Sequence, residues 1–422
     1  MNPRHTLPGP EDITRVELPN GIIILARPNF NSPSVVINGY LAGGSLAEPP
    51  ELGGLSDFTA SALMHGNARR DFQQIYNALE SAGASLGFSG GTHTTSFGGR
   101  ALVEDLDLLL EVIRESVQEP VFPPDHIERM RAQILTHLAI RAQDTSEMAS
   151  QAFDEIVFAG HPYGRPEDGT VESVQAIQRQ HLLDFHLKHY GPKGCVICVV
   201  GGVDPLQAVE KVERTLGSWQ NPAQPQPLSL PPVTPLTELR RKQITIPGKS
   251  QSDLMIGTLG PTRSAPDFLA ASIGNNILGQ FGMYGRIGQS VREKSGLAYF
   301  AYSHMSGGIG PGVWYAGAGV DPANVDQAIE LIFDELKKFT LEHVSDEELA
   351  DTQAHFIGRL PLGLESNGGV ASSLVYLERH QMGFDYYQRY ADLVQAVTKE
   401  DILQAARQYL NLDRMAVVVA GS

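Results

Sequence analysis

The sequence predicts an α+β fold of two duplicated domains, each a mainly antiparallel β-sheet covered by helices, arranged as a clamshell. Three observations lead to this prediction. The chain has 422 residues, which is longer than one usual domain. A segment dense in Pro and Gln begins at Gly217 and has the composition of an extended linker. The stretches on its two sides repeat the same order of predicted elements.

Each element is predicted from its own residue pattern. Alternating Val, Ile, Tyr and Phe between Gly and Pro predicts strands, and apolar residues spaced three or four apart after Asp, Ser or Pro predict helices. Continuous Val and Ile runs are typical of buried strands. The repeated elements, first half against second, are β-rich segments at 14–45 and 241–259, helices at 55–66 and 265–279, strand pairs at 84–102 and 296–320, amphipathic helices at 104–120 and 321–339, further helices at 123–144 and 344–364, and closing strands at 195–203 and 414–422.

The duplication and the linker predict where the domains lie along the chain. We expect an N-terminal domain at residues 1–216, a linker at 217–240 and a C-terminal domain at 241–422. A cavity between two such domains would suit a protein that encloses its substrate.

Composition excludes several classes of function. The net charge of -16 argues against a nucleic-acid partner, which needs a basic surface, and against docking to anionic membranes. No apolar run approaches the roughly 18 residues that a membrane span requires, and the N-terminus has no signal-peptide pattern. We therefore expect a cytoplasmic protein. Cys195 and Cys198 have the CxxC spacing of zinc or redox motifs, but their Val and Ile neighbours indicate a buried strand with the two thiols on opposite faces.

Four stretches of the sequence together resemble a known family. They read ELPNGIIILARPN (17–29), AGGSLAEPPELGGLSDFTASALMHGN (42–67), HPYGRPEDGT (161–170) and GMYGRIGQSVREKSGLAYFAYS (282–303). In this order they resemble the pitrilysin, insulinase and mitochondrial processing peptidase family of inverted zinc peptidases. The resemblance covers nearly the whole chain.

An active member of that family carries His-x-x-Glu-His on its first long helix. The two His at i and i+4 share a helix face and hold Zn²⁺, while the Glu is the general base for the metal-bound water. In this register the chain has Asp57, Ala60 and Ser61, and the later acidic ligand is replaced by His137 or its neighbour Thr136. Ser61 is a poor zinc ligand and Ala60 cannot transfer a proton, so we expect no functional zinc site and no metal in this chain.

The resemblance also implies which residues bind substrate. The stretch VREKSGLAYF matches the family segment in which an Arg and a Tyr point into the catalytic cavity, here Arg292 and Tyr299. They are expected to hydrogen-bond the peptide and stabilise the oxyanion. The strand that contains Leu86, Gly87 and Phe88 lies where the family adds the substrate peptide to a sheet edge.

Together these residues predict one subunit of a two-chain peptidase, inactive alone. The chain would supply Arg292 and Tyr299 to the zinc site of a paralogous subunit, with unfolded peptide as substrate and zinc bound only by the partner. Two alternatives remain open. The chain would otherwise be an inactive structural subunit resembling respiratory-complex core proteins, or a homodimer that binds peptides without cutting them. A homodimer of the isolated chain is also possible.

Overall fold

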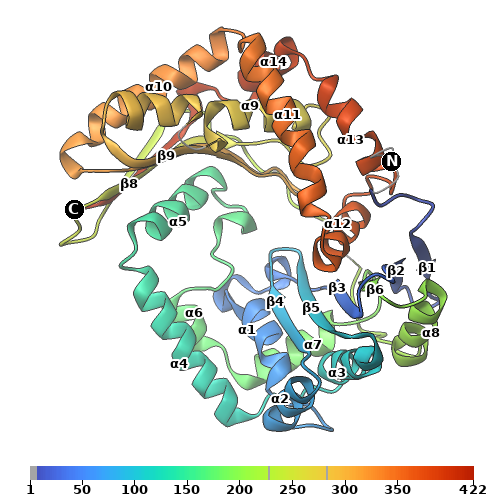
Figure 1. The fold of residues 1–422 in the computed structure, drawn as a ribbon. Helices are drawn as coiled ribbons and strands as arrows, with labels where there is room; N and C mark the ends of the chain where they lie inside the picture. Colours follow the sequence, from blue (N-terminus) through green and yellow to red (C-terminus); the bar gives the residue numbers. More distant parts are fainter. Residues whose placement is uncertain (1–6, 227–228, 282–283) are drawn as a thin grey trace. The chain divides into compact units, whose positions relative to one another are not determined.

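The computed structural model describes residues 7–226, 229–281 and 284–422 (Figure 1). Within these ranges, no helix is long and apolar enough to cross a membrane. The chain forms two compact units, each built from several segments. Unit 1 comprises Met1–Leu138, Pro166–Ser229 and Leu360–Arg389, and unit 2 comprises Ala139–Arg165, Leu230–Arg359 and Tyr390–Ser422.

Unit 1 contains a six-stranded sheet in the order β1-β2-β6-β3-β5-β4. All neighbouring strands are antiparallel except β2 and β6, which are parallel. The central strand β6 is buried along its whole length, as its continuous Val and Ile run predicts. The strands are β1 (Thr14–Glu17), β2 (Ile23–Pro28), β3 (Ser34–Ala42), β4 (Ser85–Gly90), β5 (Thr94–Leu102) and β6 (Val196–Gly201).

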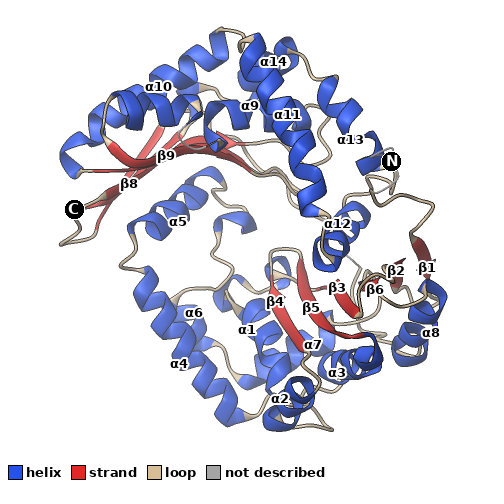
Figure 2. Ribbon diagram, in the orientation of Figure 1, coloured by secondary structure: helices blue, strands red, loops and turns tan. Residues whose placement is uncertain are grey.

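Helices cover both faces of this sheet (Figure 2). Seven of them contribute to unit 1 from the first half of the chain, and α12 comes from the second half. Cys195 belongs to the core on one face and Cys198 to the core beneath α12, so the two thiols do lie on opposite faces. The helices are α1 (Leu55–Ala62), α2 (Phe72–Ser81), α3 (Leu106–Gln118), α4 (Pro124–Arg141), α6 (Val171–Ala176), α7 (Arg179–His189), α8 (Pro205–Leu216) and α12 (Asn367–Arg379).

Unit 2 contains a five-stranded sheet in the order β7-β11-β8-β10-β9. Among the strands in the described ranges, β7 and β11 are its one parallel pair, so both sheets are mainly antiparallel, as predicted. The strands are β7 (Arg240–Thr245), β8 (Ser252–Leu259), β9 (Ala298–Met305), β10 (Val313–Val320) and β11 (Ala416–Gly421).

The helices of unit 2 repeat the arrangement of unit 1. A large core lies between one sheet face and a layer of helices, and α5 covers the other face with Ala149, Ala152, Phe153 and Val157. The helices are α5 (Thr145–Val157), α9 (Phe268–Asn275), α10 (Val325–Leu341), α11 (Asp346–Gly363), α13 (Tyr386–Gln395) and α14 (Lys399–Tyr409).

The predicted duplication is confirmed, and it includes an exchange of helices. Helices α5 and α12 both have 13 residues and follow 18-residue helices, α4 and α11. Helix α5 from the first half packs on the sheet of unit 2, and α12 from the second half packs on the sheet of unit 1. The ranges 1–216 and 241–422 stay a prediction for the repeat along the sequence, and each compact unit takes one helix from the other half of the chain.

Candidate functional site

Helix α1 stands where the sequence predicts the helix of the zinc motif. Gly54 precedes it with a φ of 91°, a left-handed conformation that glycine adopts without strain. The buried carboxylate of Glu48 accepts the backbone N–H groups of Gly54 at 2.9 Å and Ser56 at 3.0 Å, and its charge complements the helix N-terminus. Leu55 and Phe58 then pack into the core. Sequence reasoning missed Glu48, although an acid shortly before a helix is a recognisable signal.

Two of the three positions of the zinc motif, Asp57 and Ala60, have structural roles. Asp57 Oδ1 accepts the backbone N–H of Gly90 at 3.1 Å, which joins α1 to the end of β4. Burial raises the pKa of the Asp57 carboxyl, and the Gly90 hydrogen bond opposes this shift. Ala60 is fully buried, and Ser61 is half-buried. The helix and its packing are thus retained without the groups that hold zinc.

The later helix does not restore the site. His137 lies on α4 with 68% of its side chain exposed, and its Nε2 is 3.9 Å from Asp168 Oδ2. Its neighbour Thr136 donates its hydroxyl to the carbonyl of Ala132 at 2.8 Å. In the described part of the chain, no group of three His, Cys, Asp or Glu residues is arranged to hold a metal ion. A protein zinc site needs at least three such ligands, so the residues present do not fit zinc.

The predicted peptide-binding residues lie on an edge strand. Leu86, Gly87 and Phe88 belong to β4, the last strand of the six-stranded sheet, and β4 pairs only with β5 in that sheet. Gly87 and Phe88 line a cavity of about 530 Å³ whose other wall includes Ser372 and Val375 of α12. An added Cβ at Gly87 would meet no atom within 4 Å, so the sheet face is open at this position.

Arg292 and Tyr299 come together through a tight turn in unit 2. Arg292 lies near the end of a π-helical segment, Gly288–Lys294, and Tyr299 is the second residue of β9. Between them, Gly296 has a φ of +64°, and its N–H donates to the carbonyl of Arg292 at 2.9 Å. π-Helical turns are rare and are frequent at functional sites.

A β-bulge determines how the Tyr299 side chain points. In the pairing of β9 with β10, Gly319 is opposite Phe300 and Val320 is opposite Ala298, so Tyr299 is the extra residue. A bulge bends a strand and redirects the side chain of its extra residue. Tyr299 is 80% exposed, although it is a large aromatic residue within a sheet.

The two side chains are close together and open to ligands. The guanidinium carbon of Arg292 lies 5.8 Å from the centre of the Tyr299 ring, and its Nε is 3.8 Å from Glu293 Oε1. Among the residues that the structure describes, none hydrogen-bonds the Tyr299 hydroxyl. Gly282 and Met283, which open the family-like segment 282–303, lie outside the described residues.

Comparison with protein-family models identifies the family. Residues 24–170 match the model described as insulinase (peptidase family M16), and residues 176–356 match the peptidase M16 inactive domain. The chain belongs to peptidase family M16. The predicted identity is therefore confirmed, and this M16 chain lacks an active zinc motif at Asp57, Ala60 and Ser61.

Relatives of this M16 chain match over nearly its whole length. An uncharacterized zinc protease of Streptomyces coelicolor is 27% identical over 409 residues, which cover 94% of this chain and 87% of the relative. A second, from Rickettsia bellii, is 26% identical over 425 residues, covering 97% of this chain and 98% of the relative.

Solved structures share the complete fold. A peptidase M16 inactive domain from Pseudomonas fluorescens, 25% identical, matches with a TM-score of 0.88 over 97% of this chain and 98% of that chain. A Helicobacter pylori protease, 18% identical, matches in fold with a TM-score of 0.90 over 98% of this chain and 100% of that chain. This M16 chain thus shares the two-domain fold of both structures.

Proposed function

We propose that this chain is the subunit of a two-chain M16 peptidase that holds no zinc itself. It supplies Arg292 and Tyr299 to an unfolded peptide bound at the zinc site of a paralogous subunit. Two findings support the proposal: the family membership, and a zinc helix whose motif positions are occupied by Asp57, Ala60 and Ser61. Because Ala60 replaces the general base, hydrolysis by the usual route requires another chain.

The observation that carries the proposal is the bulge that exposes Tyr299 beside Arg292. A buried structural Tyr would cover its ring with the sheet or with a helix, but 80% of this residue faces solvent. A phenol and a guanidinium are strong donors, and one donor aimed at an oxyanion accelerates hydrolysis by roughly 100-fold or more. The conformation of the loop therefore favours binding of a ligand over packing within the unit.

The edge of unit 1 suits the same substrate. An extended peptide that adds to β4 would form backbone hydrogen bonds, which do not depend on its sequence. The open sheet face at Gly87 and the cavity beside Gly87 and Phe88 offer space for alternate side chains of such a peptide. An unfolded peptide is the substrate that can present such a strand.

The experiment is reconstitution with a paralogue from the same genome that carries His-x-x-Glu-His. Each chain and their mixture are analysed by native mass spectrometry and by cleavage of a fluorogenic unfolded peptide. We expect neither chain to cleave alone, the mixture to form a 1:1 complex that cleaves, and Arg292→Ala to lower kcat by about 100-fold. The control Arg359→Ala alters an exposed arginine on α11 and should have no effect.

The other outcomes identify the alternatives. A complex that forms and keeps full activity with Arg292→Ala would contradict the donor role and favour a structural subunit. A stable homodimer that binds the peptide and ignores the paralogue would favour a homodimeric peptide-binding protein. Cleavage by the isolated chain would overturn the proposal entirely.

A further inference from the structure

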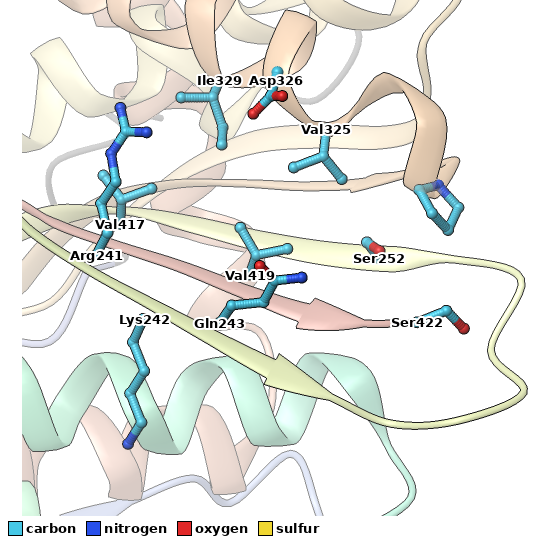
Figure 3. A pocket seen from close by; sticks show the side chains of 11 residues that line it. Arg241, Lys242, Gln243, Ser252, Val325, Asp326, Ile329, Val417, Val419 and Ser422 are labelled. Carbon is cyan, nitrogen blue, oxygen red and sulfur yellow. The ribbon is translucent and has the colours of Figure 1, made fainter.

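The two units differ at one edge of their sheets. In unit 1, α8 follows β6 and packs against α3, the edge strand β1 and its neighbour β2, burying Ala208, Val209, Val212 and Leu216. In unit 2, the place beside α10, β7 and β11 is a groove of about 440 Å³ (Figure 3). By chain order, α10 corresponds to α3, β7 to β2 and β11 to β6.

The strand registers confirm this correspondence. Ile24 is opposite Ile197 and Ala26 is opposite Val199 in unit 1, where all four are buried. The equivalent pairs in unit 2 are Arg241 with Val417 and Gln243 with Val419. All four of these residues line the groove.

The floor of the groove is apolar and its outer strand is polar. Val417, Val325 and Ile329 face the open space, whereas Arg241 and Gln243 are exposed on β7 (Figure 3). The equivalent residues on β2 of unit 1, Ile24 and Ala26, are apolar and buried. The groove therefore lies at the place that α8 occupies in unit 1, with a more polar outer strand.

An acidic residue also occupies equivalent positions in the two units, at the start of α3 and at the start of α10. Asp107, the second residue of α3, pairs with Lys211 at 2.5 Å and Arg214 at 2.9 Å, both on α8. Asp326 is the second residue of α10, is exposed, and lines the groove. Among the described residues, no cation forms an ion pair with Asp326. Asp326, the counterpart of Asp107, thus has no cationic partner among the described residues of unit 2.

We propose that this groove docks an amphipathic α-helix of a partner protein. The helix would place two basic side chains, spaced three apart as in α8, beside Asp326, and its apolar face on Val417, Val325 and Ile329. A polar or acidic residue of the helix would meet Arg241. Addition of a strand to the open edge is disfavoured because β7 carries three consecutive basic residues, a feature that blocks edge pairing.

This surface is separate from the proposed substrate donors. The groove lies at the β7 edge of the five-stranded sheet, and Tyr299 lies on β9, at the opposite edge. The inference therefore does not depend on the peptidase role, and either can fail alone.

The probe is a synthetic copy of α8, residues 204–217, with a hydrocarbon staple joining positions 206 and 210. Both positions are exposed in α8, so the staple fixes the helix without altering its buried face. Binding of the fluorescent probe to the full chain is measured by anisotropy. We expect saturable binding with a Kd below about 1 mM, and Asp326→Lys should weaken it about tenfold by replacing two attractions with repulsion.

Matched variants test both the position and the charge. Glu330→Lys makes the same charge change on an exposed residue of α10 that does not line the groove, and it should leave Kd unchanged. Arg241→Ile restores the residue type of Ile24 and should tighten binding of this apolar probe. A probe with Glu at positions 211 and 214 should prefer the Asp326→Lys variant to the unmodified chain.

Three results would overturn the proposal. They are absence of saturable binding, equal effects of Asp326→Lys and Glu330→Lys, and displacement of the probe by a strand peptide copied from residues 12–19. The last result would show that the edge accepts a strand rather than a helix.

Discussion

We expect Asp154 to make the stability of unit 2 depend on pH. This residue lies on α5, and burial raises the pKa of its carboxyl to about 7. Among the described residues, no cation lies within ion-pair distance of it. Replacing it with Asn keeps the shape and removes the charge, so Asp154→Asn isolates the cost of ionisation.

The size and sign of the effect follow from the pKa. Because the folded-state pKa lies above the ordinary value of 3.8, the folded chain holds this proton more tightly than the unfolded chain. The stabilisation is present below pH 4 and is lost as the pH rises through 7. One pKa unit corresponds to about 1.4 kcal/mol, so protonated Asp154 contributes at most about 4 kcal/mol to the free energy of unfolding. About 2 to 3 kcal/mol of this contribution is lost between pH 5 and pH 8.

Tryptophan fluorescence can follow unit 2 alone. The chain has two Trp residues, and Trp219→Phe leaves Trp314, which is buried in unit 2. In this background, urea unfolding gives the free energy of unfolding at pH 5 and pH 8. From pH 5 to pH 8, this free energy should rise by about 2 kcal/mol for Asp154→Asn relative to its Asp154 parent. The exposed Asp351→Asn should show no such gain. An equal free-energy difference between Asp154→Asn and its parent at both pH values would refute the reasoning.

Three further predictions concern the packing that positions the site. Gly296→Ala should lower the free energy of unfolding, measured by urea titration, by about 1 kcal/mol because the φ of Gly296 is positive. The control Gly358→Ala, in open space on α11, should not lower it. Gly90→Ala should cost about 2 kcal/mol or more, since its Cβ would lie 2.5 Å from the Asp57 Cα, whereas Gly87→Ala should cost little. A fragment of residues 1–216 lacks α12, so one apolar face of its sheet is exposed. This fragment should bind a hydrophobic dye and be digested readily by proteases, and resistance to proteases would contradict the prediction.

Much of the fold could be predicted from the sequence because local patterns determine it. The continuous apolar run at 196–201 predicts a central strand, and the spacing of Leu55 and Phe58 predicts the buried face of α1. The missing zinc chemistry also follows directly, because the side chains at Asp57 and Ala60 limit what any packing can achieve.

The rest depends on tertiary contacts that no local pattern reveals. Nothing in the residues of α12 shows that it packs on Leu25 and Val196, far away in the sequence. The bulge at Tyr299 arises from the offset between two strands and has no signal of its own. The hydrogen bond from Gly90 to Asp57 likewise exists only once β4 lies beside α1.

The most direct test of the account is the kcat of the reconstituted complex with Tyr299→Phe. This change removes one hydroxyl and retains the ring that lies beside Arg292. Tyr76→Phe, on α2 of unit 1, is the matched control, and native mass spectrometry checks assembly. The account predicts that Tyr299→Phe lowers kcat by about 100-fold with assembly unchanged, and that Tyr76→Phe has no effect. Unchanged kcat in an intact complex would contradict the claim that this chain contributes to catalysis.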